Sequence, residues 1–209
     1  MVSAVHVSRH PLVLVKLAEL RSVDTPTWQF RPLVRDLTQL LFVEATHDLL
    51  VEPVTVRTPL GDCRAHRVAE RVGLMPILRA GLGMVDPILD MVPDAAVWHL
   101  GLYRDHDTLQ PVTYYNKLPA ELAIDLCLVL DPMLATGGSA YAAIDILKKG
   151  GGRRIKFLGL IAAPEGVRAL QQAHPEVPIH VAAVDSHLNE KGYIVPGLGD
   201  AGDRQFGTL

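Results

Sequence analysis

The sequence is poor in cysteine and has no apolar run that approaches membrane-spanning length. Cys63 and Cys127 are the only cysteines among 209 residues, which argues against a disulfide scaffold, and no CxxC metal motif is present. The amino-terminal residues lack the apolar core of a signal peptide. These absences predict a cytoplasmic protein with no membrane partner.

The sequence also lacks a long basic run and the common nucleotide-binding motifs. Its formal net charge is −3, which argues against nucleic acid as the main partner. No G-x-x-x-x-G-K-[ST] motif occurs, so a Walker-type triphosphatase is excluded. A G-x-G-x-x-G pattern does occur at residues 197–202, but only seven residues follow it. No βαβ unit fits there, so the pattern does not predict a dinucleotide site.

From residue 72 onward the chain alternates between short apolar runs and segments with helical spacing. The runs predict strands at 72–78, 96–103, 126–130, 155–163 and 179–184, and the intervening spacing predicts helices at 84–91, 139–149 and 164–173. Repeated βα units of this length imply an α/β fold with a mainly parallel sheet flanked by helices.

Residues 10–52 precede this alternation and carry apolar residues at helical spacing in two segments. They form either a flap or dimer arm, or helices that only pack on the sheet. Residues 51–67 predict a β-hairpin arm at the sheet's edge. We expect one domain, 1–209, with a helical segment and hairpin arm at 1–70, an α/β core at 71–192 and a carboxyl-terminal segment at 193–209.

The stretch from Leu126 to Ser139, LCLVLDPMLATGGS, joins a buried strand to a glycine-rich turn and a helix. Glycine lets an anion approach the backbone closely, and N–H groups at a helix start bind phosphate. Asp131 follows the strand, where a carboxylate can accept hydrogen bonds from sugar hydroxyls. The stretch therefore predicts a ribose phosphate site, with an ordinary βα turn as the alternative.

Four segments together resemble the type I phosphoribosyltransferases, and among them the uracil phosphoribosyltransferase family. They are the stretch above, PILRAGLGM at 76–84, GLYRD and TLQPVTYYNKLP within 101–119, and YIVPGLGDAGDRQFGT at 193–208. The resemblance covers nearly the whole chain. It implies an enzyme of pyrimidine salvage that transfers phosphoribosyl from 5-phospho-α-D-ribose 1-diphosphate (PRPP) to N1 of uracil, giving uridine monophosphate (UMP) and diphosphate.

The resemblance also implies a PRPP site. Arg79 and Arg104 would bind the diphosphate, and a strained cis peptide bond is expected from Arg79 to Ala80. For Arg79 the alternative is a surface arginine in a salt bridge. Asp131 would bind the ribose hydroxyls, and Asp200 would face the ribose or magnesium. The other PRPP-binding residues would be Pro132, Met133, Leu134, Ala135, Thr136, Gly137, Gly138 and Ser139, of which 135–139 would hold the 5′-phosphate.

Residues 105–118 form a polar segment that is long for a connection, which indicates a binding loop or lid. The resemblance makes it a flexible cover for the reacting centre. His106 lies in this segment and is either a general base or a solvated loop residue; we favour the second interpretation.

Residues 193–209 would hold the base. The resemblance places uracil contacts at Ile194, Gly199, Asp200 and Ala201, largely through backbone groups, and cytosine would present the reverse donor and acceptor pattern to them. No general base is evident. Asp200 is the one candidate, and a turn aspartate is its structural alternative.

Many type I enzymes carry two adjacent acids where this chain has Asp131 and Pro132. We therefore expect no direct metal ligand from the protein, and Mg²⁺ to arrive on PRPP with its own waters. The resemblance further implies a homodimer or higher homo-oligomer, and GTP as an activator. Two rival functions are a regulator that binds nucleic acid and an enzyme for another base, such as a purine.

Overall fold

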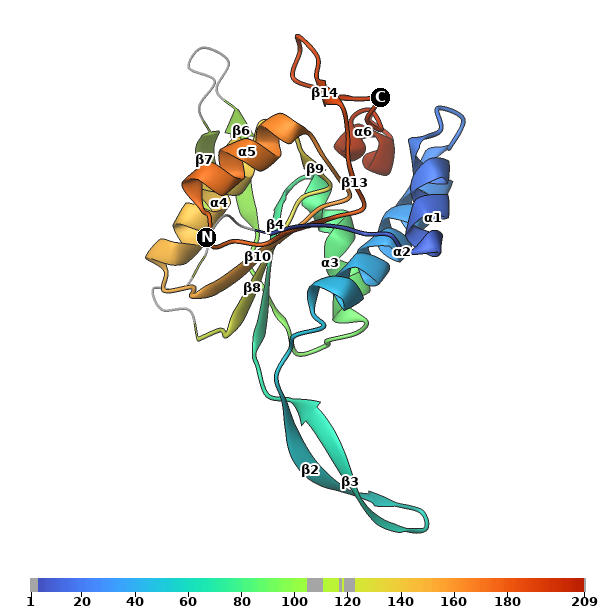
Figure 1. The fold of residues 1–209 in the computed structure, drawn as a ribbon, viewed down its shortest axis with the longest axis vertical. Coiled ribbons are helices and arrows are strands. Elements are labelled where there is room, and N and C mark those ends of the chain that lie inside the picture. The colour runs from blue at the N-terminus through green and yellow to red at the C-terminus, as the bar shows by residue number, and fades with distance from the viewer. Residues whose placement is uncertain (1–3, 105–110, 117, 119–122, 209) are drawn as a thin grey trace.

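The computed structural model describes residues 4–104, 111–116, 118 and 123–208. Its centre is an eight-stranded sheet in the order β1-β12-β10-β8-β4-β6-β7, with β5 paired to β4 (Figure 1). All its strand pairs are parallel except β6 with β7, which confirms the mainly parallel sheet. The strands are β1 (Val5–Val7), β4 (Val72–Leu78), β5 (Ala96–Val97), β6 (Leu100–Arg104), β7 (Pro111–Asn116), β8 (Leu126–Leu130), β10 (Arg154–Leu158) and β12 (Ile179–Val181).

Helices cover both faces of this sheet, and the alternation along β8 shows why. Leu126 and Leu128 belong to a core shared with α1 (Pro11–Arg21), α2 (Thr27–Ala45) and α3 (Val85–Leu89). Cys127 and Val129 point into a second core, shared with α4 (Gly138–Lys149) and α5 (Pro164–Ala173). Since successive side chains of a strand face opposite sides, a fully apolar strand requires such a layer on each face.

The amino-terminal helices pack on the sheet, which is the second of the two interpretations of residues 10–52. Side chains of both helices, including Leu20 and Phe30, are buried in the first core. Strand β1 was not predicted, and it forms one edge of the sheet by pairing in parallel with β12. None of the described helices is long and apolar enough to cross a membrane.

The hairpin was predicted at the sheet's edge, and that placement is wrong. Strands β2 (Val51–Thr58) and β3 (Gly61–Val68) pair only with each other in the described part of the chain, and they project away from the body (Figure 1). Most of their side chains are exposed. Arg57, Asp62 and Arg64 lie on one face of the hairpin, and Glu52 and Arg67 lie on the other. Neither face could therefore be buried against the sheet without desolvating charge.

Three of the predicted strands are each divided in two. The strand expected at 155–163 becomes β10 and β11 (Ile161–Ala162), and that at 179–184 becomes β12 and β13 (Ala183–Val184), while 96–103 becomes β5 and β6. Together with β9 (Met133–Leu134), β11 and β13 form a separate three-stranded sheet. The strand at 155–163 divides where Leu160 and Ile161 donate their N–H groups to Pro132 O, outside the main ladder. This small sheet carries the start of the glycine-rich turn.

The remaining elements lie around the predicted site. The helix predicted at 84–91 is shorter in the structure, where α3 covers residues 85–89, and it is preceded by an unpredicted 3₁₀ helix, η1 (Ala80–Met84). Near the carboxyl end, β14 (His187–Leu188) pairs with β15 (Ile194–Val195), and α6 (Ala201–Phe206) follows.

Candidate active site

Three neighbouring parallel strands bring predicted site residues to one edge of the sheet. Strand β4 pairs with β8 on one side and with β6 on the other. Asp131 directly follows β8, Arg79 directly follows β4, and Arg104 ends β6. The carboxyl ends of parallel strands are where open α/β sheets bind ligands. The side chain of Arg104 and the whole of His106 lie outside the described part of the chain.

The turn after β8 joins buried anchor residues to the start of a helix. Pro132 and Leu134 are buried, so they anchor the turn, whereas Thr136 and Ser139 are partly exposed. Helix α4 begins at Gly138, and its N-cap, Gly137, has a φ of +85° with no side-chain cap. Because the first N–H groups of a helix have no partner within it, they are available to an anion.

Asp131 combines partial burial with a single backbone hydrogen bond. The Met133 N–H donates to its Oδ1 across 3.3 Å. Burial raises the pKa of this carboxyl group to about 7, and the hydrogen bond from Met133 offsets part of that rise. The side chain therefore changes charge near neutral pH, and a ligand that donates hydrogen bonds to it would favour its ionised form.

Arg79 begins the loop after β4, and the cis peptide bond precedes it instead of following it. The bond joins Leu78 to Arg79, so the prediction of a cis bond from Arg79 to Ala80 is wrong. Arg79 has helical dihedral angles and its carbonyl accepts the Leu82 N–H at 3.1 Å, so the peptide after it belongs to the first turn of η1 and is trans. The Arg79 Nη2 lies 3.0 Å from an oxygen of Asp203, which is the salt bridge of the alternative interpretation.

The carboxyl-terminal segment contains a short strand and a short helix. Ile194 is buried in β15, and Asp200 caps α6 by accepting the Asp203 N–H at 2.9 Å. This short helix was not predicted. The spacing of two acids three residues apart, Asp200 and Asp203, resembles a capping box and was the signal that could have revealed it. Asp200 is thus the N-cap of a helix, and one of its oxygens is engaged there.

Two arginines that the motif analysis did not single out fix this segment. The Arg204 guanidinium donates to the carbonyl oxygens of Leu20, Leu198, Ser22 and Thr25 at distances of 2.6–3.3 Å. Arg21 makes two hydrogen bonds to Asp185, at 2.8 and 2.5 Å, and a third to Gly197 O at 2.6 Å. Nothing in the spacing of these residues indicates such contacts, since most of them join the two ends of the chain.

Gly166 is another residue that the sequence analysis missed. It lies in α5 and is buried against the glycine-rich turn after β8. A Cβ at this position would lie 2.4 Å from Ala135 O and 2.7 Å from Leu134 O. The absence of a side chain here therefore allows α5 to pack directly against the turn.

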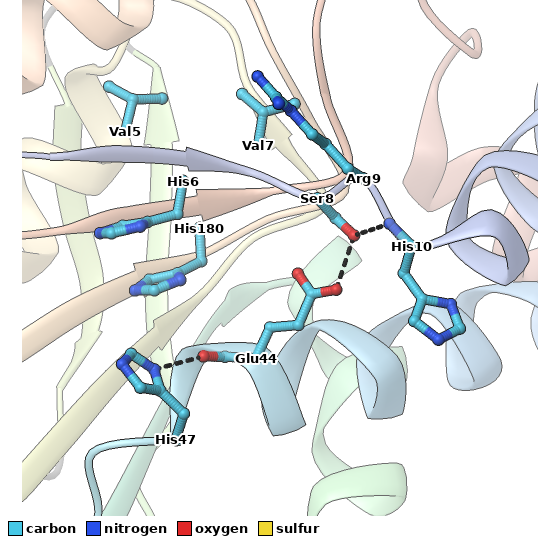
Figure 2. Close-up of a pocket in the computed structure, with 9 residues that line it drawn as sticks. All are labelled: Val5, His6, Val7, Ser8, Arg9, His10, Glu44, His47 and His180. Carbon is cyan, nitrogen blue, oxygen red and sulfur yellow. Dashed lines mark hydrogen bonds between the residues drawn. The ribbon is translucent and has the colours of Figure 1, made fainter.

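A separate cavity of about 670 Å³ lies beside β1 and the end of α2 (Figure 2). The rings of His6 and His180 stack in it with centroids 4.5 Å apart, and Glu44 accepts a hydrogen bond from the Ser8 hydroxyl at 2.8 Å. None of the predicted site residues lines it. In the described ranges, no group of three or more His, Cys, Asp or Glu side chains is placed to hold a metal ion.

Comparisons with known proteins agree with this geometry. Residues 7–208 match the family model described as uracil phosphoribosyltransferase. The chain is 69% identical to a uracil phosphoribosyltransferase of Roseiflexus castenholzii, over 98% of each protein. It is 58% identical to one of Symbiobacterium thermophilum, over 99% of each.

Solved structures agree as well. The AQ2163 protein from Aquifex aeolicus matches with a TM-score of 0.91 and 39% identity, over 97% of each chain. A hypoxanthine-guanine phosphoribosyltransferase of Bacillus anthracis, with a TM-score of 0.52 and 10% identity over 75% of this chain and 79% of that one, shares the fold. The matched residues include every segment that forms the edge described above, and the chain belongs to the uracil phosphoribosyltransferase family.

Proposed function

We propose that this enzyme transfers phosphoribosyl from PRPP to N1 of uracil and does so at the carboxyl ends of β8, β4 and β6. One observation carries the proposal. The turn after Asp131 and the side chain of Arg79 lie at the ends of neighbouring strands, and the carboxyl-terminal segment contacts Arg79. One group of residues would hold an anionic sugar donor, and the adjacent segment would hold a base.

The donor would bind with its 5′-phosphate at the start of α4. Backbone N–H groups of residues 135–139 and the hydroxyls of Thr136 and Ser139 would donate to the phosphate. Asp131 would accept hydrogen bonds from the ribose 2′ and 3′ hydroxyls. With its pKa at about 7, it would bind them best when ionised, so donor affinity would rise as the pH increases through 7.

The site must stabilise two charges that develop as the bond from C1 to the diphosphate breaks. Positive charge grows on the sugar ring, and negative charge grows on the leaving diphosphate. Arg79 and Arg104 would meet the second charge, because a guanidinium fork can donate to two phosphate oxygens at once. Ionised Asp131 would lie on the sugar side, where it favours the first charge.

Magnesium would supply further neutralisation of the diphosphate. We propose that it arrives on PRPP with its own waters, since Pro132 occupies the position at which many type I enzymes have a second acid. Asp200 would face the ribose or the magnesium side, and its Oδ1 is shared with the cap of α6. It is the candidate general base, and no other residue is proposed for that role.

Uracil would bind to backbone groups of Ile194 and of Gly199 to Ala201. An N–H group for O4, a carbonyl for the N3 hydrogen and an N–H group for O2 would match uracil and mismatch cytosine. Unpaired buried groups of this kind can discriminate by about 10⁴-fold. A cytoplasmic location, a homodimer or larger homo-oligomer, and activation by GTP stay predictions of the family resemblance.

The direct test measures UMP formation from uracil and PRPP, with and without Mg²⁺, with cytosine and hypoxanthine as competing bases. We expect turnover that depends on Mg²⁺ and is confined to uracil. Asp131→Asn should lower turnover by about 100-fold, as expected when an interaction made with the developing charge is lost. Turnover of another base would contradict the base site, and full activity of Asp131→Asn would remove Asp131 from the donor site. If no base reacts, nucleic-acid binding would be measured next.

A further inference from the structure

The carboxyl-terminal helix lies directly against the loop that carries Arg79. The Gln205 side chain donates from Nε2 to Ala80 O at 3.2 Å. A Cβ on Gly202 would lie 3.9 Å from both the Ala80 Cβ and the Arg79 Nη2. The proposed base segment and the proposed diphosphate loop therefore form one packed unit, and side chains of α6 can act on Arg79.

Asp203 is the side chain of α6 that contacts Arg79. Its Oδ1 accepts from the Arg79 Nη2 at 3.0 Å and from the Thr208 hydroxyl at 2.6 Å. The hydrogen bond from Thr208, and then that from Arg79, lower the pKa of the Asp203 carboxyl group. The carboxylate is thus ionised at neutral pH and held by two hydrogen bonds, while the backbone N–H of the same residue donates to Asp200.

The Asp203 carboxylate contacts the Arg79 guanidinium at one nitrogen only, in an end-on arrangement. Among the described residues, the Arg79 guanidinium makes one hydrogen bond, through Nη2, although such a group has five N–H donors. The Arg79 side chain is 56% exposed and that of Asp203 30%, so their pairing adds little to stability. Its physical effect is to restrict a long side chain that would otherwise sample many rotamers, while leaving the other donors available.

We propose that Asp203 is a positioning residue for the diphosphate half of PRPP. It holds the guanidinium of Arg79 at one corner, so that the remaining N–H groups face the leaving diphosphate. Thr208 keeps the carboxylate in place, and the cap at Asp200 ties it to the proposed uracil segment. This inference rests on the proposed function, because it takes Arg79 to be a diphosphate ligand.

The test compares Asp203→Ala and Asp203→Asn with the unchanged enzyme in steady-state kinetics of UMP formation. We expect Asp203→Ala to raise the KM for PRPP about tenfold, because Arg79 must then be ordered by the substrate itself. The kcat and the KM for uracil should stay within about twofold. Asp203→Asn keeps an oxygen that accepts from Arg79 and Thr208, so it should restore the KM for PRPP to within about threefold.

Glu52→Ala is the matched control, since Glu52 pairs with Arg67 at 2.5 Å on the hairpin, which projects away from the body (Figure 1). It should leave all three constants unchanged. A fall in the KM for PRPP in Asp203→Ala would overturn the proposal, because Asp203 would then compete with the substrate for Arg79. An equal rise in both KM values would overturn it too, since the base segment itself would have moved. Unchanged constants would show that the ion pair is incidental.

Calorimetric binding of magnesium diphosphate separates this proposal from the proposed function. If the unchanged protein binds diphosphate but forms no UMP, and Asp203→Ala weakens that binding, the positioning role stands while the base assignment fails. If the unchanged protein forms UMP and Asp203→Ala binds diphosphate as tightly as it does, the positioning role fails alone. If the unchanged protein neither binds diphosphate nor forms UMP, both fail.

Discussion

At the scale of single residues, Asp131 combines a proposed role in donor binding with a cost to stability. Burial raises the pKa of its carboxyl group to about 7 in the folded protein, against 3.8 for an unperturbed aspartate. A folded-state pKa above the unfolded value means that the folded protein binds the proton more tightly. Its contribution to stability is complete below pH 3.8 and is lost as the pH rises through 7.

Asp131→Asn should therefore stabilise the protein at high pH. The amide cannot ionise, and its oxygen can still accept the Met133 N–H. We expect the Tm of the variant to exceed that of the unchanged protein at pH 8, and the difference to shrink towards pH 5. Scanning calorimetry at several pH values measures this, with the exposed Asp94→Asn as the control. A difference that is constant with pH would contradict the raised pKa.

Gly166 is a residue whose lack of a side chain allows two elements to pack closely. Gly166→Ala suits helix α5, because alanine has the higher helix propensity. Its Cβ would however lie 2.4 Å from Ala135 O, so the glycine-rich turn after β8 must shift. We expect the KM for PRPP to rise about tenfold and the Tm to fall by several °C, because the overlap is with backbone atoms and overpacking of this kind costs about 1–3 kcal/mol. Gln172→Ala, exposed on the same helix, is the control; an unchanged KM for PRPP would show that the turn adapts.

At the scale of elements, the edge strand β1 depends on the ionisation of buried histidine. His180 in β12 stacks on His6 in β1 within the cavity of Figure 2. Burial first, and then the neighbouring His6 and Lys156, lower the pKa of His180 to about 4, although Asp48 acts in the opposite direction and His47 adds a smaller lowering effect. Protonation of this ring would place charge between the two strands.

Acid should accordingly loosen β1. The pKa of His180 is lower in the folded protein than in the unfolded chain, so stability is lost as the pH falls from about 6.5 to 4. We expect His180→Phe, which keeps an aromatic ring, to lose less Tm over this pH range than the unchanged protein. Hydrogen exchange of residues 5–7 gives a local measure. His66→Gln, exposed on the hairpin, should keep the original pH profile, and a matching profile in His180→Phe would refute the explanation.

At the scale of the whole molecule, the two ends of the chain meet to build the proposed base site. Arg204 reaches the carbonyl groups at residues 20, 22 and 25, and its guanidinium lies 4.5 Å from the centroid of the Phe30 ring. These contacts hold the segment from 198 to 204 against the turn between α1 and α2. Residues of the amino-terminal helices and the turn between them thus determine the position of the backbone groups proposed to bind uracil.

Arg204→Lys should therefore weaken uracil binding more than PRPP binding. A lysine cannot donate to four carbonyl groups in the plane of one fork, and some of those oxygens would lose their partner. We expect a loss of about 2 kcal/mol in stability, which corresponds to about 5 °C in Tm for a chain of this size, and a rise in the KM for uracil. The exposed Arg153→Lys is the control. A larger rise in the KM for PRPP would place the effect on the donor site.

The sequence by itself determined the parallel α/β core and the strand, turn and helix around Asp131. The apolar strand 126–130 and the glycines after it specify these elements locally, and helix α5 begins and ends where its spacing predicts. Family motifs in consecutive residues predict roles for Arg79 and the carboxyl-terminal segment, and those roles stay predictions.

Only the tertiary structure decided which distant residues support these motifs. The pairing of Arg79 with Asp203, the fit of Gly166 under Ala135 and the hydrogen bonds of Arg204 to residues 20, 22 and 25 each join segments separated by 31 to 184 positions. The structure also places the hairpin away from the sheet and the cis peptide bond between Leu78 and Arg79. Such features depend on packing and charge burial between elements, so they cannot be predicted from the periodicity of one segment.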